Sequence, residues 1–584
     1  DGKVRYEVVH DANGPKGADD GTVNRGNAIA IGDGTPIENK YIRSEANEGR
    51  LGSQLIAVVA EGNRRRLYIS PTEDQVDSAC VARPTDVPNQ LIPTRNHDVD
   101  RLPMYGMPTW ADAFTNRQLV ALTTFSDLVD EARERAFSDA LTSGMDKGES
   151  LENGGLGARA YADAVGVYLA LTVSRCAEYW SSFTSWISKG EGIRNVFARQ
   201  AISMVWDYFE ANPFSSSAGN FIDRLGWVVD VVKMVPAANS AKVMQASATV
   251  RDYSALVVST DPPYYDNIGY SDLSDFFYVW LRRCLADVIP KFFGTMLTPK
   301  AEELVANPNR HGGQDKAAEF FIDGFNRVFK RIREGARQDI PITVYYAYKQ
   351  QDHGKEGVSS TGWHTLLDGL IGAGWEVTAT WPVRTEKPGR SVSFDSNALA
   401  SSIVLACRPR PDDAPTTTQR AFVQRMRAEL PDALRTLMQG EIAPVDLAQA
   451  AIGPGIAVFS SYSRVRSASG SDVGAREALE LINRTLDEVL GEQESDFDPD
   501  TRFAVRWYRQ YGWRPETSGI ADQLARTTQT SIAELERGGI FVTAGGKGRL
   551  LRISELDAEW NPAEDSRLSI WEATLRLAAC MQSS

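Results

Sequence analysis

The stretch SALVVSTDPPY, residues 254–264, decides the fold prediction. Its first part, SALVVST, is a continuous apolar run of the length that is typical of a strand buried on both faces. The second part, DPPY, begins directly where that run ends. In open sheets flanked by helices, ligands bind beyond the carboxyl ends of the strands. The sequence therefore predicts a buried strand that delivers residues 261–264 to a binding site.

The two prolines of this motif make the predicted loop stiff. Each proline fixes φ at about −65° and lacks a backbone N–H, so the carbonyls of Asp261 and Pro262 are free to accept hydrogen bonds. A carboxylate beside such a carbonyl can accept both hydrogens of one exocyclic amino group. Tyr264 supplies an aromatic face for a planar base, and such stacking contributes about 1–3 kcal/mol. The motif therefore indicates a site for the amino group of a nucleobase.

Methylation of that amino group needs this arrangement. The nitrogen lone pair is delocalised into the base, and hydrogen bonds to Asp261 and a backbone carbonyl would localise it. Attack on a methyl sulfonium then depends mainly on positioning, and the base must be flipped out of a duplex to reach the loop. The alternative is a proline-rich turn without chemistry. The catalytic candidates are Asp261, Pro262, Pro263 and Tyr264.

Strand and helix patterns alternate after the motif. We predict helices over residues 274–288, 314–337 and 361–373, and strands over residues 341–348, 375–383 and 401–408. Such alternation is typical of a parallel sheet covered on both faces. Because no helix separates the last two strands, we expect them to form an antiparallel hairpin. The predicted fold class is α/β, with a Rossmann-like sheet that is parallel except for this hairpin.

The chain is expected to contain four regions. Residues 1–110 are rich in Gly, Pro, Asn and Asp and predict small strands and long loops, and they are a candidate target-recognition region. Residues 111–240 are helical, and residues 241–410 are the catalytic core. A proline-rich linker then leads to residues 416–584, which are mainly helical.

Local signals support the helical regions. Thr115 and Gln118 form a capping-box pattern before an apolar periodicity, and further helices fit residues 159–180 and 193–210. Near the C-terminus, a helix over residues 531–537 followed by a hairpin resembles a small winged helix. We favour a packing module over a DNA-binding role for it.

Composition bounds the class of protein. The 584 residues include 63 Lys+Arg and 77 Asp+Glu, so the net charge is −14. No apolar run approaches the ~18 residues of a membrane helix, and five scattered cysteines fit a reducing cytoplasm. We therefore expect a cytoplasmic protein that does not enter the membrane.

The acidic balance argues against a nucleic-acid partner, but phosphate contacts need only a local basic face. Basic candidates for that face are residues 64–66, Arg282, Arg283, Lys300, Arg310, Lys387 and Arg390. Tyr264, Tyr265 and Asn267 are further nucleic-acid-binding candidates, and Asp266 continues their loop.

DPPYYDNIGYSDLSDFFYVWLRR, residues 261–283, resembles the adenine-specific DNA methylases that carry an N-terminal domain of unknown function and a zinc-ribbon segment. Some of these methylases occur in phage-defence loci of the DISARM type. The resemblance continues in GTVNRGNA (21–28), YIRSEANEGRLGSQLIAVVAEG (41–62), TWADAFTNRQLVALTTFSDLV (109–129), MVWDYFEANPF (204–214), LTPKAEELVANPNRHGG (297–313), ATWPVRTE (379–386) and SNALASSIVLACRPR (396–410).

This resemblance implies a class I methyltransferase sheet and S-adenosyl-L-methionine as the cofactor. It implies transfer of a methyl group to N6 of a flipped adenine in double-stranded DNA, in a restriction or phage-defence context with other defence proteins as partners. Many methyltransferases bind the cofactor adenine through an acidic residue at the end of their third strand, where this chain has Ser247. The cofactor-binding candidates are therefore Asp261, Pro262 and Ser247.

Two departures from the family matter. The family carries a glycine-rich cofactor loop upstream of DPPY, but no apolar strand precedes the glycines at 154–157 or 312–313. Since the chain also begins with Asp1 rather than Met, we hypothesise that a preceding segment or a second chain completes the cofactor pocket. The Cys-x-x-Cys of the zinc ribbon is replaced by AIAIGDG (28–34), so we expect a degenerate ribbon and no bound metal.

Two alternatives remain open. The same loop could methylate cytosine N4 or an RNA base. Alternatively, the chain could be a non-catalytic DNA-binding subunit of a defence complex, which the missing glycine loop favours and the intact DPPY opposes.

Overall fold

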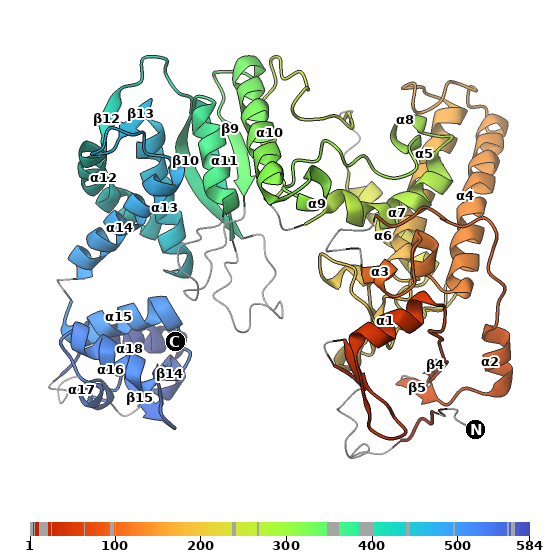
Figure 1. The fold of residues 1–584 in the computed structure, drawn as a ribbon, viewed down its shortest axis with the longest axis horizontal. Helices are drawn as coiled ribbons and strands as arrows, with labels where there is room; N and C mark the ends of the chain where they lie inside the picture. The colour runs from red at the N-terminus through yellow and green to blue at the C-terminus, as the bar shows by residue number, and fades with distance from the viewer. Residues whose placement is uncertain are drawn as a thin grey trace. The chain divides into compact units, whose positions relative to one another are not determined.

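The computed structural model describes residues 4, 6–10, 22–24, 26–63, 65–93, 99, 101–235, 241–265, 268–346, 361–384, 401–439, 444–494, 497–556, 560–561 and 567–583. The protein is a mixed α/β chain that divides into two compact units (Figure 1). Unit 1 comprises Asp1–Ser247 and Asp266–Phe320, and unit 2 comprises Ala248–Tyr265 and Phe321–Ser584. The division groups residues 266–320 with the N-terminal part, whereas the sequence analysis placed them in the catalytic core.

Unit 1 is built around three helices, α4 (Asn116–Thr142), α5 (Ala158–Ala177) and α7 (Tyr270–Leu285). They pack on one another over a core that includes Trp110, Trp180 and Trp280. The shorter elements of this unit are β1 (Val23–Asn24), β2 (Asn27–Ile29), β3 (Pro36–Ile37), α1 (Asn39–Asn47), β4 (Val58–Gly62), β5 (Arg65–Ile69), α2 (Glu73–Ala79), α3 (Arg101–Met104), β6 (Ser185–Ile187), β7 (Gly192–Arg194), α6 (Phe221–Met234), α8 (Pro290–Phe293) and α9 (Pro308–His311).

The capping box predicted before α4 is confirmed. The Thr115 side chain accepts a hydrogen bond from the Gln118 N–H, and the Gln118 side chain accepts one from the Thr115 N–H. Leu119, Leu122 and Val129 are buried on the inward face of the helix, as its periodicity predicts. The predicted helix over residues 159–180 also corresponds to α5.

The helix predicted over residues 193–210 is wrong. Strand β7 and a single 3₁₀ turn (Val196–Ala198) begin this stretch, and no helix follows them up to residue 210. The Val196 N–H donates to the Glu178 carbonyl at the end of α5 (3.1 Å), and the Asn195 side chain also bonds Glu178. These long-range bonds hold the backbone in an extended path, and they outweigh the local periodicity.

Unit 2 contains a four-stranded sheet in the order β10–β11–β9–β8. Strand β8 (Ser259–Thr260) is parallel to β9 (Ile342–Tyr346), and β11 (Ser401–Pro409) is antiparallel to both β9 and β10 (Trp375–Arg384). The predicted hairpin of the last two strands is therefore confirmed. β11 lies between β9 and β10, so the sheet has one parallel pair and two antiparallel pairs.

The predicted strand over residues 254–260 shortens to its last two residues. Ala255 has φ +59°, and its N–H donates to the Gly335 carbonyl (3.1 Å). Among the described residues, the only ladder partner of this run is β9, which begins at Ile342 and pairs with Ser259 and Thr260. Within that part of the chain, most of the run therefore has no partner strand. Leu256 and Val257 remain 37% and 58% exposed.

Helices α10 (Gln314–Gly335) and α11 (Thr361–Gly372) match their predicted ranges, and α7 begins four residues earlier than predicted, at Tyr270. Gly374, the predicted helix stop, has φ +85°. In the following part of unit 2, α12 (Gln419–Gln439), α13 (Pro444–Ser460) and α14 (Ala475–Glu494) pack on one another, and α13 and α11 also contact β10. A two-stranded parallel sheet, β12 (Thr416–Thr418) and β13 (Arg464–Arg466), lies beside them (Figure 1).

The C-terminal part folds around its own core of Phe503, Trp507, Phe541 and Leu550. Its three-stranded sheet has the order β14–β16–β15, and the predicted helix before the β15–β16 hairpin is present. Its elements are α15 (Pro499–Tyr511), β14 (Glu516–Thr517), α16 (Ser518–Thr527), α17 (Ile532–Arg537), β15 (Phe541–Ala544), β16 (Lys547–Leu550) and α18 (Ile570–Ser583).

Candidate functional site

The loop that begins at Asp261 stands at the carboxyl end of the parallel strand pair. Ser259 lies opposite Thr343 and Thr260 opposite Val344, and Asp261 is the first residue beyond β8. This is the edge at which open α/β sheets bind their ligands. The structure therefore places the predicted catalytic residues where the sequence analysis expected them relative to their strand.

Asp261 presents an acceptor that the described part of the protein leaves unused. Its side chain is exposed, and none of the described residues donates a hydrogen bond to it or forms an ion pair with it. Partial burial of the carboxyl group raises its pKa above the usual value. Pro262 and Pro263 follow in trans and have no N–H that could donate to a neighbouring group.

The two tyrosines that follow are held by aromatic rings of unit 2. The Tyr264 ring meets the Tyr346 ring edge to face, with 5.4 Å between centroids, and Tyr346 stacks on Trp363 at 5.7 Å. The Tyr265 ring meets Phe321 edge to face at 5.0 Å. Each such pair contributes about 0.5–1.5 kcal/mol beyond the burial of its area. The loop is therefore fixed to β9, α10 and α11 through its aromatic side chains.

Gly362 makes this close packing possible. A Cβ at residue 362 would lie 2.6 Å from the Tyr346 hydroxyl and 2.8 Å from the Tyr265 Cβ. Real Cβ atoms do not approach so closely, and the Tyr265 Cβ cannot rotate away because it belongs to the backbone frame. The first turn of α11 therefore needs a glycine where it passes the loop.

Several predicted site residues lie outside the described residues. They are Arg64, Asp266, Asn267, Lys387 and Arg390. Their predicted roles in binding substrate or DNA stay predictions.

Ser247 is the last residue of the first segment of unit 1. Residues 241–247 form no regular element, so Ser247 does not lie at the end of a strand, where methyltransferases place the residue that contacts the cofactor adenine. Its predicted role in cofactor binding stays a prediction.

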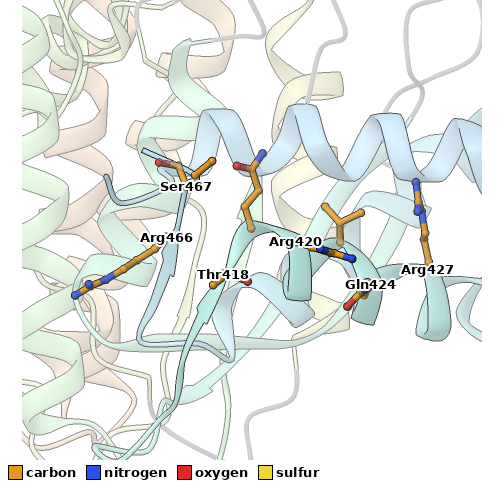
Figure 2. Close-up of a pocket in the computed structure, with 9 residues that line it drawn as sticks. Thr418, Arg420, Gln424, Arg427, Arg466 and Ser467 are labelled. Atoms are coloured by element: carbon orange, nitrogen blue, oxygen red, sulfur yellow. The ribbon is translucent and has the colours of Figure 1, made fainter. Parts of the chain in front are cut away.

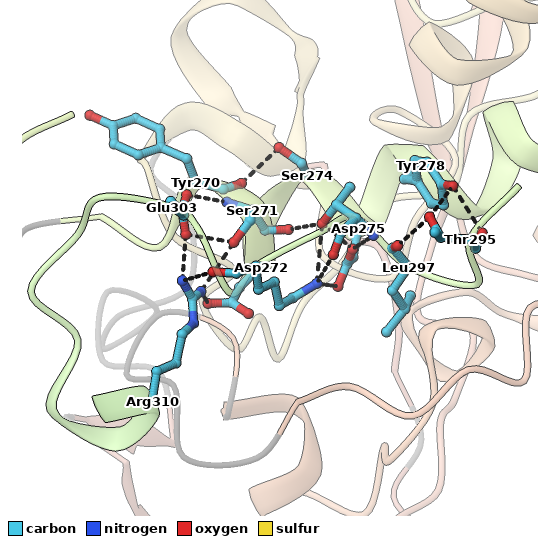
Figure 3. A network of polar contacts seen from close by, with 12 residues as sticks. Tyr270, Ser271, Asp272, Ser274, Asp275, Tyr278, Thr295, Leu297, Glu303 and Arg310 are labelled. Carbon is cyan, nitrogen blue, oxygen red and sulfur yellow. Dashed lines mark hydrogen bonds and ion pairs between the residues drawn. The ribbon is translucent and has the colours of Figure 1, made fainter. Parts of the chain in front are cut away.

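Lys300 and Arg310 take part in a polar network within unit 1 (Figure 3). The Lys300 ammonium lies 2.7 Å from a carboxylate oxygen of Asp275, and Arg310 pairs with Asp272 and with Glu303 (2.5 Å). Both basic side chains are more than four-fifths covered. Their charges thus compensate carboxylates inside the fold, although the sequence analysis proposed them for phosphate contacts.

The carboxylates of this network are buried charged residues, which are common in functional sites. They were not among the site residues predicted from the sequence. Asp272 is 1% exposed and Asp275 is 0% exposed, on successive turns of α7. Asp275 also accepts hydrogen bonds from the Thr298 N–H and hydroxyl (2.9 and 2.6 Å), and burial raises the pKa of Asp272 although Arg310 lies beside it. The signal was present in the sequence as two carboxylates three residues apart on an apolar helix face.

The network fixes the segment that follows α7. Glu303 accepts from the Ser271 N–H and hydroxyl (2.8 and 2.6 Å), and Thr298 donates to the Ser271 carbonyl (2.6 Å). Residues 298–310 are therefore tied to the first turn of the helix that comes directly after the Asp261 loop in the chain. Buried charges of this kind are stable only when every partner is present.

The other basic candidates have partners as well. Arg283 pairs with Asp86 and Asp127 (2.6 and 2.7 Å), and Arg282 donates to the Thr295 carbonyl (2.9 Å). Arg65 and Arg66 lie in β5, where the Arg66 guanidinium lies over the Trp186 ring.

Metal-ligating residues do not gather in the described part of the chain. Searching it finds no group of three or more His, Cys, Asp and Glu side chains that could hold a metal ion. The expectation that the protein binds no zinc stays a prediction. Likewise, none of the described helices is long and apolar enough to cross a membrane.

The helix that precedes the C-terminal hairpin is not basic. In α17, Glu534 pairs with Arg567 (3.3 Å), and Glu536 accepts a hydrogen bond from the Thr543 N–H (2.9 Å). Helices that enter a DNA groove approach a negatively charged backbone. This arrangement favours the packing-module interpretation of the winged-helix-like part.

The comparisons with known proteins reach only this C-terminal part. Residues 498–584 match the family model described as a domain of unknown function, DUF8807. No curated protein and no solved structure matches the chain.

Proposed function

We propose that the protein is the catalytic part of an S-adenosyl-L-methionine-dependent DNA methyltransferase that acts on the N6 amino group of a flipped adenine. The observation that carries this proposal is the Asp261 loop. It joins an unused carboxylate, a proline carbonyl and a braced aromatic ring at the carboxyl end of two parallel strands. The same resemblance that suggested the activity suggests a restriction or phage-defence setting.

The sheet supports the proposal. Its order and directions are β8 and β9 parallel, then β11 antiparallel, then β10 at the far edge. The later half of a class I methyltransferase sheet has this arrangement, with the catalytic loop on the first of the four strands. The fold of unit 2 is thus consistent with a methyltransferase core of which the described strands are one half.

The residues would act by holding the target amino group. The Asp261 carboxylate and the Pro262 carbonyl accept its two hydrogens, which concentrates the lone pair on nitrogen. Pro262 and Pro263 keep the two acceptors in place, and Tyr264 stacks on the base. When bound, the cofactor supplies the methyl group. The contribution of these side chains is positioning, which in enzymes can account for several kcal/mol of the barrier.

The described residues account for binding of the base that accepts the methyl group, but not for binding of the cofactor. Among them, no glycine-rich turn leads from a strand of the four-stranded sheet into a helix, and β8 is an edge strand preceded by the exposed side chains of Leu256 and Val257. The run over residues 254–260 is apolar like a central strand, but as an edge strand it has no neighbour among the described residues on its outer side. We propose that a preceding segment or a second chain pairs with β8 and completes the cofactor pocket.

The decisive experiment is nucleoside mass spectrometry of duplex DNA after incubation with the protein and cofactor, alongside the Asp261→Ala variant. N6-methyladenine that depends on Asp261 supports the proposal. N4-methylcytosine or a methylated RNA base would transfer the proposal to the other acceptor.

The second candidate function is a non-catalytic DNA-binding subunit, which the exposed edge of β8 favours. Isothermal titration of S-adenosyl-L-methionine into the protein tests whether this chain holds the cofactor by itself, and tight binding would contradict the non-catalytic subunit. Tight binding by this chain alone would contradict the idea that another segment completes the pocket. Full biological activity of Asp261→Ala would favour the non-catalytic subunit.

A further inference from the structure

A second charged surface lies on the two-stranded parallel sheet of unit 2. Thr416 lies opposite Arg464 and Thr418 opposite Arg466, and all four side chains are exposed. Val465, between the two arginines, is buried. Because side chains alternate between the faces of a strand, both arginines and both threonines project from one face.

Helix α12 adds to this face. Arg420, in its first turn, and Arg427, two turns later, line a pocket of about 670 Å³ together with Thr418, Arg466 and Ser467 (Figure 2). A second pocket of about 480 Å³ shares Thr418 and Arg466 with the first. No described carboxylate and no described aromatic ring lines either pocket. We name Arg420, Arg464 and Arg466 the basic face.

The charges of the basic face are not compensated within the described part of the fold. Arg427 binds Glu488 at 2.5 Å and is neutralised there. By contrast, neither Arg420 nor Arg466 forms an ion pair or side-chain hydrogen bond with any described residue. Asp472 lies opposite Arg466 in an isolated antiparallel β-bridge. Its carboxylate lines neither pocket. This concentration of positive charge contrasts with the net charge of −14.

Hydroxyl groups border the same face. The side chains of Ser467, Ser469 and Ser471 lie within 2.8–3.1 Å of one another in the turn after β13. Hydroxyl donors beside guanidinium groups are the partners that phosphate oxygens take in proteins. Cations together with hydroxyls suit a phosphate group, and no described carboxylate lines either pocket.

The face is remote from the Asp261 loop. β11 is antiparallel to β9, so the carboxyl end of β11 lies where β8 and β9 begin. β12 follows β11 after a short connection. Asp261 lies at the other end of these strands, directly after β8. A phosphate bound at the basic face therefore belongs to a contact other than the one around a flipped base.

We propose that the basic face binds successive phosphates of a DNA backbone, at a site separate from the Asp261 loop. The choice of DNA rests on the proposed function. Arg464 and Arg466 are two residues apart on a strand, which spaces them by about 6.6 Å along an open surface. With no ring to stack on a base, the contact reads backbone and not sequence. A backbone contact away from the target would hold long DNA while the enzyme samples bases.

The test is fluorescence-anisotropy titration of a labelled duplex with the full chain over a series of salt concentrations. Each phosphate contact contributes about 0.9 to the slope of log K against log salt. We expect Arg420→Gln/Arg466→Gln to lower the slope by about 1–2 and to weaken low-salt binding roughly tenfold. Arg435→Gln, which removes an exposed arginine elsewhere on α12, is the matched control and should change neither quantity.

The outcomes are distinguishable from those of the methylation assay. The salt slope counts phosphate contacts and needs no methyl transfer, so a lower slope in Arg420→Gln/Arg466→Gln would support the basic face even if no Asp261-dependent methylation were found. An unchanged slope and affinity in Arg420→Gln/Arg466→Gln would overturn the proposal. It would also be overturned if inorganic phosphate, ATP or polyglutamate competed as well as DNA per charge, since the face would then take a small phosphate or an acidic protein.

Discussion

The Tyr264 ring of the Asp261 loop meets the Tyr346 ring of β9 edge to face, with 5.4 Å between centroids. Tyr346 is 3% exposed and stacks in turn on Trp363 of α11. The ring that we propose as a platform for the base is thus braced by a buried strand and a helix. Residues that contact these rings should therefore affect activity through the position of Tyr264.

Gly362→Ala should damage this bracing. The added methyl group would lie 2.6 Å from the Tyr346 hydroxyl and 2.8 Å from the Tyr265 Cβ. We expect a loss of about 1–3 kcal/mol in unfolding free energy and a fall in methylation of at least tenfold, roughly, because the loop shifts. Urea denaturation and nucleoside mass spectrometry measure the two effects.

Gly372→Ala is the matched control on the same helix. No atom lies within 4 Å of its added Cβ, so stability should be unchanged or up to about 1 kcal/mol higher. If the two alanine variants behaved alike, the packing of α11 against the loop would be irrelevant to the site.

Asp261→Asn should abolish most methylation and leave the fold intact. The neutral amide is a weaker hydrogen-bond acceptor than the carboxylate, and removal of one such electrostatic contact typically lowers a rate by about 10²–10³. The raised pKa means that the ionised carboxylate is disfavoured in the fold, so the variant should be at least as stable as the parent at pH 7. Asp323→Asn, an exposed carboxylate on α10, is the control.

The pH profile should report the same carboxyl group. Asp261 must be ionised to accept the amino hydrogens, and partial burial raises its pKa above 3.8. Activity should therefore fall as the pH drops through that raised value, with the slope of one proton. The profile of kcat/KM against pH measures it. An acid limb centred at or below 3.8, or one that persists in Asp261→Asn, would argue against this role.

Arg310→Gln should destabilise unit 1. It leaves Asp272, which is 1% exposed, without its cation, and an uncompensated buried charge typically costs about 3–5 kcal/mol. Arg135→Gln removes a surface pair with Asp139 instead and should cost no more than about 1 kcal/mol. Thermal or urea unfolding compares the two variants.

The same variant separates the two roles suggested for Arg310. In Arg310→Gln/Asp272→Asn the charge of Asp272 is gone and only Glu303 has lost its cation, so part of the stability should return. If DNA affinity and its salt slope also return to those of the parent, Arg310 is structural. A persistent loss of slope by about 0.9 would instead assign it a phosphate contact.

Features with a local cause were predictable from the sequence. The capping box at Thr115 and the α10 periodicity depend on neighbouring residues, and both are present. The β10–β11 pair was predictable because no helix pattern separates the two strands. The failed helix over residues 193–210 has the opposite cause. Its backbone bonds to Glu178, which no local pattern reveals.

The candidate site likewise has features that the local sequence predicts and features that depend on tertiary contacts. The position of Asp261 followed from an apolar run that ends in two prolines. The bracing by Tyr346, Trp363 and Gly362 did not, because it depends on which strand and helix lie beside the loop. The salt links of Arg310 were equally invisible, since its charge alone predicts a surface role as readily as a buried one.

The division of the chain has a consequence for any attempt to separate the two units. The chain crosses from unit 1 into unit 2 at Ala248, leaves it again after Tyr265, and returns within α10 at Phe321. No single backbone cut can therefore release either unit whole. One of the crossings immediately follows Tyr264 and Tyr265, so a fragment that ends there would part the proposed catalytic loop from α7, the next helix along the chain.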